Sequence, residues 1–324
     1  MSSEIPVAAR ELIGDQDGVL TLAQAHACGL TDKYVVAALR TGRWQRLHAG
    51  VYGVFSGPPP RPTQLWAAVL RVGPEAVLSH HSAAELYGLL PDPAPAIHVM
   101  VSRGHRVAPI AGLIVHHSRR LAEARHPVLT PPRTRFEETI LDLAGAARSL
   151  DDALGWVLRA CGSRRTTPDR LAAAMALRTR MRWRTELAAA LGLAAEGVHS
   201  LLEFRYVRRV ERPHGLPVGA RQHRVVRVGQ RQYQDITYQG YGLVVELDGV
   251  VAHPAESRWH DVRRDNANTV VRQSTLRYGW ADVTDRPCFV AGQVAAALAA
   301  RGWTGVLRRC GGSCGLPGTA PSRT

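Results

Sequence analysis

The stretch QYQDITYQGYGLVVELDG, residues 232–249, decides the fold predicted for the last third of the chain. Asp235 precedes a turn marked by Gly240 and Gly242, and Glu246 ends the apolar run YGLVVE, so the stretch predicts two strands of one hairpin. Because side chains alternate between the two faces of a strand, both acids can reach the same face. Paired carboxylates are oxygen ligands that Mg²⁺ prefers, and such a metal can activate water against a phosphodiester. We therefore expect Asp235 and Glu246 to bind Mg²⁺ or Mn²⁺.

Further ionisable side chains flank this hairpin. Residues 199–210, HSLLEFRYVRRV, predict an amphipathic helix that carries Glu203, and Asp248 and His253 follow Glu246. We expect Glu203 to be an outer metal ligand or a base, Asp248 to orient metal-bound water, and His253 to act as a general acid or base near neutral pH. The arginines expected to contact phosphates here are Arg205, Arg263 and Arg264. The alternative, a purely structural role for these acids and for His253, stays open.

The order of these features resembles the restriction-endonuclease-like, or PD-(D/E)XK, superfamily. A helix with Glu203, a strand with Asp235, a strand with Glu246-Leu-Asp-Gly, His253, a helix and a strand follow one another over about residues 195–300. Within the superfamily the stretch is similar to very-short-patch-repair endonucleases and to relatives with an E-[VI]-D-G-x-x-H type motif. The resemblance implies a metal-dependent DNA endonuclease that hydrolyses phosphodiester bonds.

One departure from the superfamily pattern puts that activity in doubt. The pattern usually ends in Glu-x-Lys, but Asp248 stands where the lysine would be, and Lys33 is the only lysine of the chain. His253 or Arg264 could substitute for it. The alternative is a catalytically inactive nuclease fold retained in a DNA-binding transcriptional regulator or antitoxin.

The first 55 residues predict a winged helix-turn-helix. Thr21 caps a helix over residues 22–29, Thr31 caps a second over residues 32–42, and the alternating stretch 43–54 predicts a β-hairpin wing. The second helix of such a motif enters the DNA major groove with its N-terminal residues against base edges. The residues expected to contact DNA are Thr31, Lys33, Tyr34 and Arg40, with Arg43 and Arg46 flanking them as phosphate contacts. A helical hairpin that binds protein instead is the alternative.

Residues 18–54, GVLTLAQAHACGLTDKYVVAALRTGRWQRLHAGVYGV, resemble the N-terminal winged-helix domain of AbiEi-family antitoxins. The later VLSHHSAAELYGL, residues 77–89, resembles a segment that recurs in the same proteins. This resemblance implies a DNA-binding transcriptional autoregulator paired with a nucleotidyltransferase-like toxin. A cognate toxin is therefore a candidate partner.

The remaining pattern predicts an α/β (α+β) multidomain chain. A Pro-rich linker at 56–63 separates the winged helix of residues 1–55 from a small antitoxin-like α/β domain at 64–185. Strands are expected at 97–102, 113–118 and 276–284. The restriction-endonuclease-like α/β domain would span 186–303, and a disordered tail 304–324.

Charge supports a nucleic-acid partner. The 324 residues contain 41 basic and 27 acidic side chains, a formal net charge of +14. Codon bias explains arginine in place of lysine but not the excess of basic over acidic residues. An interaction protein whose charge reflects codon bias alone is a third reading.

Five scattered cysteines argue against a disulfide framework and favour a reducing cytoplasm. We expect no membrane span and no secretory signal. Cys310 and Cys314 form a single pair, so we interpret them as incidental, since structural zinc needs four ligands. The pairs His80–His81 and His116–His117 are not expected to hold zinc, because adjacent side chains in a strand point to opposite faces.

Overall fold

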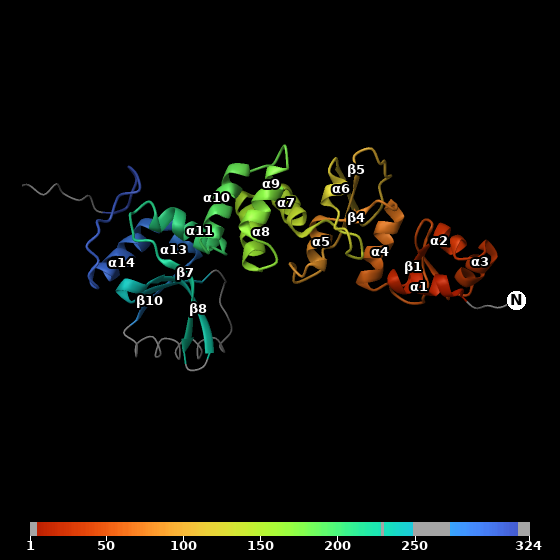
Figure 1. Ribbon diagram of the computed structural model, residues 1–324, viewed down its shortest axis with the longest axis horizontal. Helices are drawn as coiled ribbons and strands as arrows, with labels where there is room; N and C mark the ends of the chain where they lie inside the picture. Colours follow the sequence, from red (N-terminus) through yellow and green to blue (C-terminus); the bar gives the residue numbers. More distant parts are fainter. Residues whose placement is uncertain (1–4, 228–229, 249–272, 317–324) are drawn as a thin grey trace, which may run out of the picture. The chain divides into compact units, whose positions relative to one another are not determined.

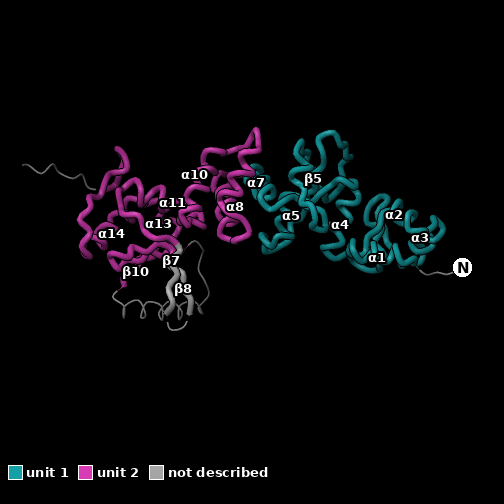
Figure 2. The backbone as a smooth tube through the Cα atoms, in the orientation of Figure 1, with its two compact units in different colours: residues 1–146 teal, residues 147–324 magenta. Residues whose placement is uncertain are grey.

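The computed structural model describes residues 5–227, 230–248 and 273–316, with the backbone alone described for 222–227 and 230–234. Contacts divide the chain into two compact units, residues 1–146 and 147–324 (Figure 2). This division falls inside the middle domain expected at 64–185, and the finer boundaries stay predictions. The chain is a mixed α/β protein, as its sequence predicts, and its described residues form three small sheets. None of the helices in the described part of the chain is long and apolar enough to span a lipid bilayer.

Unit 1 begins with a winged helix. Its elements are α1 (Val7–Asp15), β1 (Val19–Thr21), α2 (Leu22–Ala27), α3 (Asp32–Arg40), β2 (Gln45–His48) and β3 (Val51–Gly53). The three strands form an antiparallel sheet in the order β1-β3-β2. Trp44 and Tyr52 of the wing are buried against the helices.

Local chemistry sets the helix boundaries of this motif. The Thr21 hydroxyl accepts a hydrogen bond from Gln24 N at 3.0 Å, and the Gln24 side chain accepts one from Thr21 N at 2.9 Å, which makes a capping box at the start of α2. Gly29 takes a φ of +84° between α2 and α3, a conformation that glycine adopts without steric cost. Thr31 then caps α3 as predicted.

The rest of unit 1 packs helices against a second sheet. Its elements are α4 (Arg61–Val72), β4 (Val77–Leu78), α5 (His80–Leu86), β5 (Ile97–Ser102), β6 (Leu113–Ser118), α6 (Leu121–Ala124) and α7 (Phe136–Ala146). Strand β5 pairs antiparallel with β4 and parallel with β6. Strands β5 and β6 have the predicted bounds, because each is a short apolar run between turn residues.

Unit 2 begins with helices and ends in a helix-covered sheet. Its elements are α8 (Leu150–Gly162), α9 (Pro168–Ala176), α10 (Arg184–Ala195), α11 (Leu201–Tyr206), the π-helical turn η1 (Val207–Glu211), β7 (Ala220–Arg227), β8 (Gln230–Tyr238), the 3₁₀ turn η2 (Gln239–Tyr241), β9 (Leu243–Asp248), β10 (Ser274–Gly279), α13 (Trp280–Asp285) and α14 (Pro287–Ala299). The strand order is β10-β9-β8-β7, with β9 and β10 parallel and the other neighbours antiparallel. Helices α11, α13 and α14 share one core with this sheet (Figure 1).

Two parts of unit 2 differ from the expectation. The strand expected at 276–284 ends at Gly279, because the Asp282 carboxylate accepts a hydrogen bond from Gly279 N at 3.0 Å and caps α13. Residues 304–316, expected to be disordered, follow α14 as a described segment, in which Leu307 packs on the core.

Candidate functional site

The surface of α3 carries the first group of candidate residues. Thr31, Lys33 and Arg40 are exposed, whereas Val35 and Ala38 are buried on the opposite side of the helix in the winged-helix core. This division follows from the helical period, which places residues three apart on one face. The helix therefore presents a hydroxyl, an ammonium and a guanidinium to solvent.

Arg43 and Arg46 extend this surface into the wing. Both are exposed, and the Arg43 guanidinium carbon lies 5.8 Å from the centre of the Tyr34 ring. Tyr34 is half-buried, with its ring edge-on to Trp44 at a centroid distance of 5.8 Å. Tyr34 thus connects the exposed cation to the buried core of the motif, and its ring supports the position of Arg43.

The second group lies on the sheet of unit 2. Strands β8 and β9 pair with Ile236 opposite Val245, so Asp235 and Glu246, one step further along, lie opposite each other. The Asp235 carboxylate accepts a hydrogen bond from Leu247 N at 2.9 Å. Val245 belongs to the core beneath the helices, so alternation puts Glu246 on the opposite face of the sheet. The structure shows the expected hairpin, with paired residues from Tyr238 and Leu243 to Ile236 and Val245, and the metal-binding role of the two acids stays a prediction.

Arg277 is a site residue that the sequence did not indicate. Strands β9 and β10 pair in parallel with Arg277 beside Glu246, and Arg277 Nε donates to Glu246 Oε2 at 3.0 Å. Asp235, Glu246 and Arg277 therefore form a row across three strands. The stretch LRYGW had pointed only to a strand after the helix, and the pairing of β10 with β9 is what gives Arg277 its partner.

Glu203 and Asp248 are the other candidates of unit 2 within the described residues. The Glu203 carboxylate is buried and accepts a hydrogen bond from His199 N at 3.1 Å, at the start of α11. Asp235 and Glu246 are not part of any group of three described His, Cys, Asp or Glu side chains whose ligand atoms all lie within 4.8 Å of one another. Asp248 is exposed at the end of β9.

Arg205, for which phosphate contact stays a prediction, has several protein partners in the structure. It forms an ion pair with Asp151, donates to the Thr284 hydroxyl at 3.2 Å, and lies 4.5 Å from the centre of the Trp280 ring. These contacts hold α11 to α8 and α13, so they give Arg205 a role in packing. His253, Arg263 and Arg264 lie outside the described residues.

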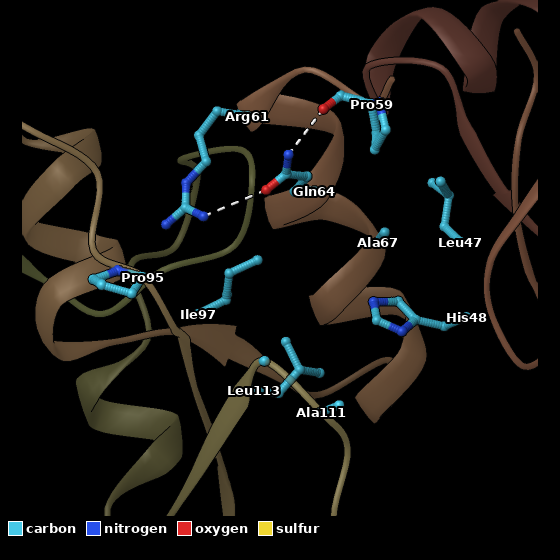
Figure 3. Close-up of a pocket in the computed structure, with 11 residues that line it drawn as sticks. Leu47, His48, Pro59, Arg61, Gln64, Ala67, Pro95, Ile97, Ala111 and Leu113 are labelled. Atoms are coloured by element: carbon cyan, nitrogen blue, oxygen red, sulfur yellow. Dashed lines mark hydrogen bonds between the residues drawn. The ribbon is translucent and has the colours of Figure 1, made fainter. Parts of the chain in front are cut away.

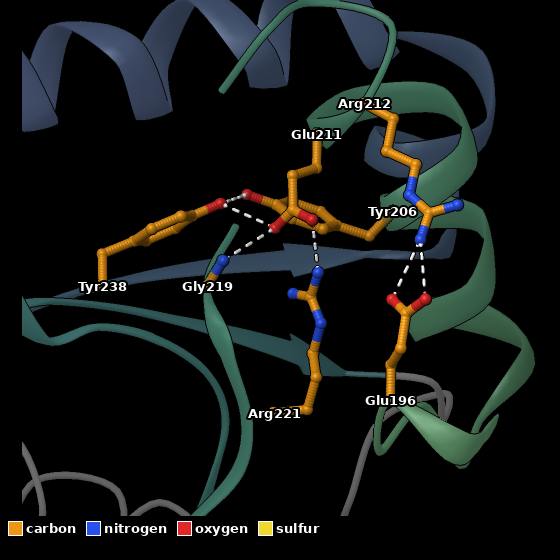
Figure 4. Close-up of polar contacts among 7 residues, drawn as sticks. All are labelled: Glu196, Tyr206, Glu211, Arg212, Gly219, Arg221 and Tyr238. Carbon is orange, nitrogen blue, oxygen red and sulfur yellow. Dashed lines mark hydrogen bonds and ion pairs between the residues drawn. The ribbon is translucent and has the colours of Figure 1, made fainter. Parts of the chain in front are cut away.

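A buried polar network supports the strand that carries Asp235. The Glu211 carboxylate, at the end of η1, forms an ion pair with Arg221 and accepts hydrogen bonds from Gly219 N and the Tyr238 hydroxyl, each at 3.3 Å (Figure 4). The Tyr206 hydroxyl lies 3.0 Å from that of Tyr238. Burial, followed by the neighbouring Glu211, raises the pKa of Tyr238, so its hydroxyl stays protonated and donates. The network joins η1 to β7 and β8.

Three histidines of unit 1 meet although no two are adjacent in sequence. His80 of α5, His98 of β5 and His116 of β6 have ring nitrogens within 4.8 Å of one another, and His98 Nδ1 lies 3.0 Å from His116 Nε2. The rings of His80 and His116 stack at a centroid distance of 3.7 Å and an angle of 14°. In-plane lone pairs of stacked rings run parallel and do not converge on one ion, so we interpret His98 and His116 as a hydrogen-bonded pair of neutral imidazoles on which His80 stacks. Burial, then His116 and His81, lowers the pKa of His98 to about 4.

A pocket of about 240 Å³ lies in unit 1 between the wing, α4 and the edges of β5 and β6 (Figure 3). Arg61 at its rim is held by Glu85 at 2.8 Å and by Ala94 O at 3.0 Å. Gln64 donates to Pro59 O at 2.8 Å. The volume is below the roughly 300 Å³ at which organic-ligand pockets begin, and these polar groups serve the local fold.

Comparison with known proteins bears on the N-terminal region. No curated protein matches the chain. Residues 8–54, which comprise the winged helix with its α3 surface, match a family described as transcriptional regulator, AbiEi antitoxin.

Proposed function

We propose that the chain is a DNA-binding transcriptional regulator that contacts duplex DNA through α3 and the wing. This proposal rests on four exposed basic residues of α3 and the wing: Lys33, Arg40, Arg43 and Arg46. The opposite side of α3 is buried in the winged-helix core. The match of residues 8–54 to an antitoxin regulator family supports it.

The chemistry of this surface suits a nucleic acid. Arginine can donate two parallel hydrogen bonds to a phosphate, and the N-terminal residues of the recognition helix meet base edges in the major groove. In this arrangement Thr31 and Lys33 would read bases, while Arg40, Arg43 and Arg46 would hold the backbone.

The test is the salt dependence of binding to a random-sequence duplex. Each phosphate contact contributes about 0.9 to the slope of log affinity against log salt concentration. The double variant Arg40→Ala, Arg43→Ala is expected to lose about two units of slope. Arg106→Ala removes an exposed arginine of the same unit outside the winged helix, and it should leave the slope unchanged. Equal slopes for both variants would refute the proposed surface.

A cognate toxin as partner belongs to the same proposal, because the matching family is described as an antitoxin. Co-expression of the chain with the product of the adjacent gene is the direct test. A stable complex that also changes DNA affinity is expected, whereas independent elution of the two proteins would remove this part of the proposal.

We propose metal-dependent phosphodiester hydrolysis as a second function, located on the sheet of unit 2. The observation that favours it is the row of Asp235, Glu246 and Arg277 on one face. Two carboxylates match the oxygen ligands of Mg²⁺ or Mn²⁺, and such a metal would supply an activated water and stabilise charge on the phosphate.

In this proposal the two acids of the row bind the metal and the arginine supplies a positive charge. Asp235 and Glu246 would hold the metal, and the Leu247 N–H orients the Asp235 carboxylate. Arg277 stays charged at neutral pH and lies beside Glu246, so it would supply the cation that the missing Glu-x-Lys lysine provides in similar sequences. Asp248 and His253 would orient water and transfer a proton, with Glu203 in a supporting position.

Cleavage of supercoiled and single-stranded DNA with Mg²⁺ or Mn²⁺ tests this second function. Asp235→Asn is expected to abolish metal-dependent nicking and to leave DNA affinity intact, because the winged helix is unchanged. Asp285→Asn, an exposed acid of α13, is the matched control and should nick at the wild-type rate. Retained DNA binding with no nicking by the wild type would overturn the nuclease and leave the regulator.

A further inference from the structure

Four metal-ligand side chains from three segments meet at one point of unit 2. His214 follows η1, Cys288 lies in the first turn of α14, and Cys310 and Cys314 belong to the segment after it. Their four ligand atoms all lie within 4.8 Å of one another. From the sequence we interpreted Cys310 and Cys314 as incidental, because they form a single pair and structural zinc needs four ligands; His214 and Cys288, remote in the chain, complete the four.

The distances match a tetrahedral site. Cys288 Sγ lies 3.7 Å from Cys310 Sγ and 3.6 Å from Cys314 Sγ, and Cys314 Sγ lies 3.8 Å from His214 Nε2. With Zn–S bonds of about 2.3 Å and a Zn–N bond of about 2.0 Å, the ligand atoms of a regular tetrahedron are about 3.5–3.8 Å apart. A disulfide needs a sulfur separation of about 2.05 Å, so the sulfurs are not placed for a covalent pair.

His214 is oriented as a metal ligand. The ring is fully buried, and Nδ1 lies 2.8 Å from Val210 O. A carbonyl oxygen only accepts, so Nδ1 carries the hydrogen, and in the neutral ring Nε2 keeps its lone pair. That lone pair belongs to the atom that faces Cys314. Donation from the second ring nitrogen to a backbone carbonyl is how metal-binding histidines are usually fixed.

The segment that bears two of the cysteines is docked on the unit by hydrogen bonding and by apolar packing. Arg308 N donates to His214 O at 2.8 Å, and within the segment Arg309 donates to Cys314 O at 3.0 Å. Trp303 and Leu307 pack on the core as partly buried side chains. The segment is rich in glycine, so ordering it costs conformational entropy, and a bound metal would offset part of that cost.

We propose that His214, Cys288, Cys310 and Cys314 form a structural Zn²⁺ site that fixes residues 303–316 to unit 2. Four protein ligands close the coordination shell, which is the pattern of a structural rather than a catalytic zinc. The site is separate from the row of Asp235 and Glu246, so it does not depend on either proposed function.

Metal analysis of the full chain, purified without chelator, is the first test. One zinc ion per chain is expected in the wild type, and Cys310→Ser and Cys314→Ser should lose it. Cys28→Ser, which removes a cysteine of unit 1, is the matched control and should retain it. Zinc that persists at wild-type content in the double variant Cys310→Ser, Cys314→Ser would overturn the proposal, because the ion would then lie elsewhere.

Cobalt titration of the wild-type protein tests the site without any substitution. Addition of Co²⁺ to metal-free wild-type protein should produce the visible d–d bands of tetrahedral, thiolate-ligated cobalt, and Zn²⁺ should remove them. Limited proteolysis after residue 302 should slow when the metal is restored. Absence of these bands, with Cys288, Cys310 and Cys314 all rapidly alkylated in freshly purified protein, would refute the site. A disulfide among the three cysteines would refute it equally.

Discussion

Replacement of Glu211 by glutamine should destabilise unit 2 far more than the same replacement at Glu196. Both residues form an ion pair with an arginine in the same region (Figure 4). The side chains of Glu211 and Arg221 are only 1% and 5% exposed, whereas those of Glu196 and Arg212 are 53% and 50% exposed. The pairs therefore differ in burial and not in chemistry.

The expected magnitudes follow from this difference. Removal of one partner from a buried ion pair leaves an uncompensated charge and costs about 3–5 kcal/mol. Glutamine keeps one acceptor oxygen for Gly219 N or the Tyr238 hydroxyl, so we expect Glu211→Gln to cost about 3 kcal/mol. An exposed ion pair contributes about 0–1 kcal/mol to stability, so Glu196→Gln should lower the free energy of unfolding by at most about 1 kcal/mol.

Urea denaturation of the full chain, followed by circular dichroism and tryptophan fluorescence, measures the difference. With a slope of about 2 kcal/mol per molar urea, Glu211→Gln should lower the midpoint of the unit 2 transition by about 1.5 M. Addition of Arg221→Met to Glu211→Gln should recover part of the loss, because the double variant buries no unpaired charge. Equal midpoints for Glu211→Gln and Glu196→Gln would refute the reasoning.

Three further changes test other parts of the structure. The pKa of His98 is lowered from 6.5 to about 4 in the folded chain, so the unfolded chain binds the proton first and stability should fall as the pH drops from 6.5 towards 4; NMR titration of the His98 ring should give the low value, and a ring that titrates near 6.5 would contradict it. Thr21→Ala should cost about 1 kcal/mol through the lost capping box, as measured by thermal unfolding, whereas Thr21→Ser should cost little. Arg277→Met leaves Glu246 without its cation and should cost about 2 kcal/mol, between the limits for exposed and buried pairs; in urea denaturation Arg277→Lys should recover most of this, and no recovery would assign the loss to packing.

Features that depend on neighbours in sequence were predictable. At the caps of Thr21 and Thr31 the threonine hydroxyl accepts a hydrogen bond from the backbone N–H three residues later, so a local sequence pattern is enough to predict them. Strands β5 and β6 are short apolar runs, and their bounds agree with the pattern. The pairing of β8 with β9 was predictable because a short turn fixes the register of a hairpin, and alternation assigns Asp235 and Glu246 to one face.

Features that depend on contacts between distant segments could not be predicted from the sequence. The protein partners of Arg205 could not be read from its arginine-rich helix, because the docking of α8 and α13 brings Asp151 and Trp280 to it. The end of β10 at Gly279 results from one side-chain cap, and the apolar pattern of residues 276–284 does not contain that information. His214 and Cys288 meet only after η1 and α14 have packed.

Because the chain has a single lysine, Lys33, the positive charge beside Glu246 comes from Arg277. Arginine keeps its proton at all accessible pH values, so Arg277 beside Glu246 can stabilise negative charge but cannot accept a proton from water. In a hydrolase built on this row, proton removal would therefore fall to a carboxylate or to histidine, and the cation and the base would be separate residues. A lysine at the position of Asp248 could have combined both tasks. In such a hydrolase Asp248 would stand where similar sequences carry lysine, Arg277 would supply the positive charge beside the phosphate, and a different residue would accept the proton.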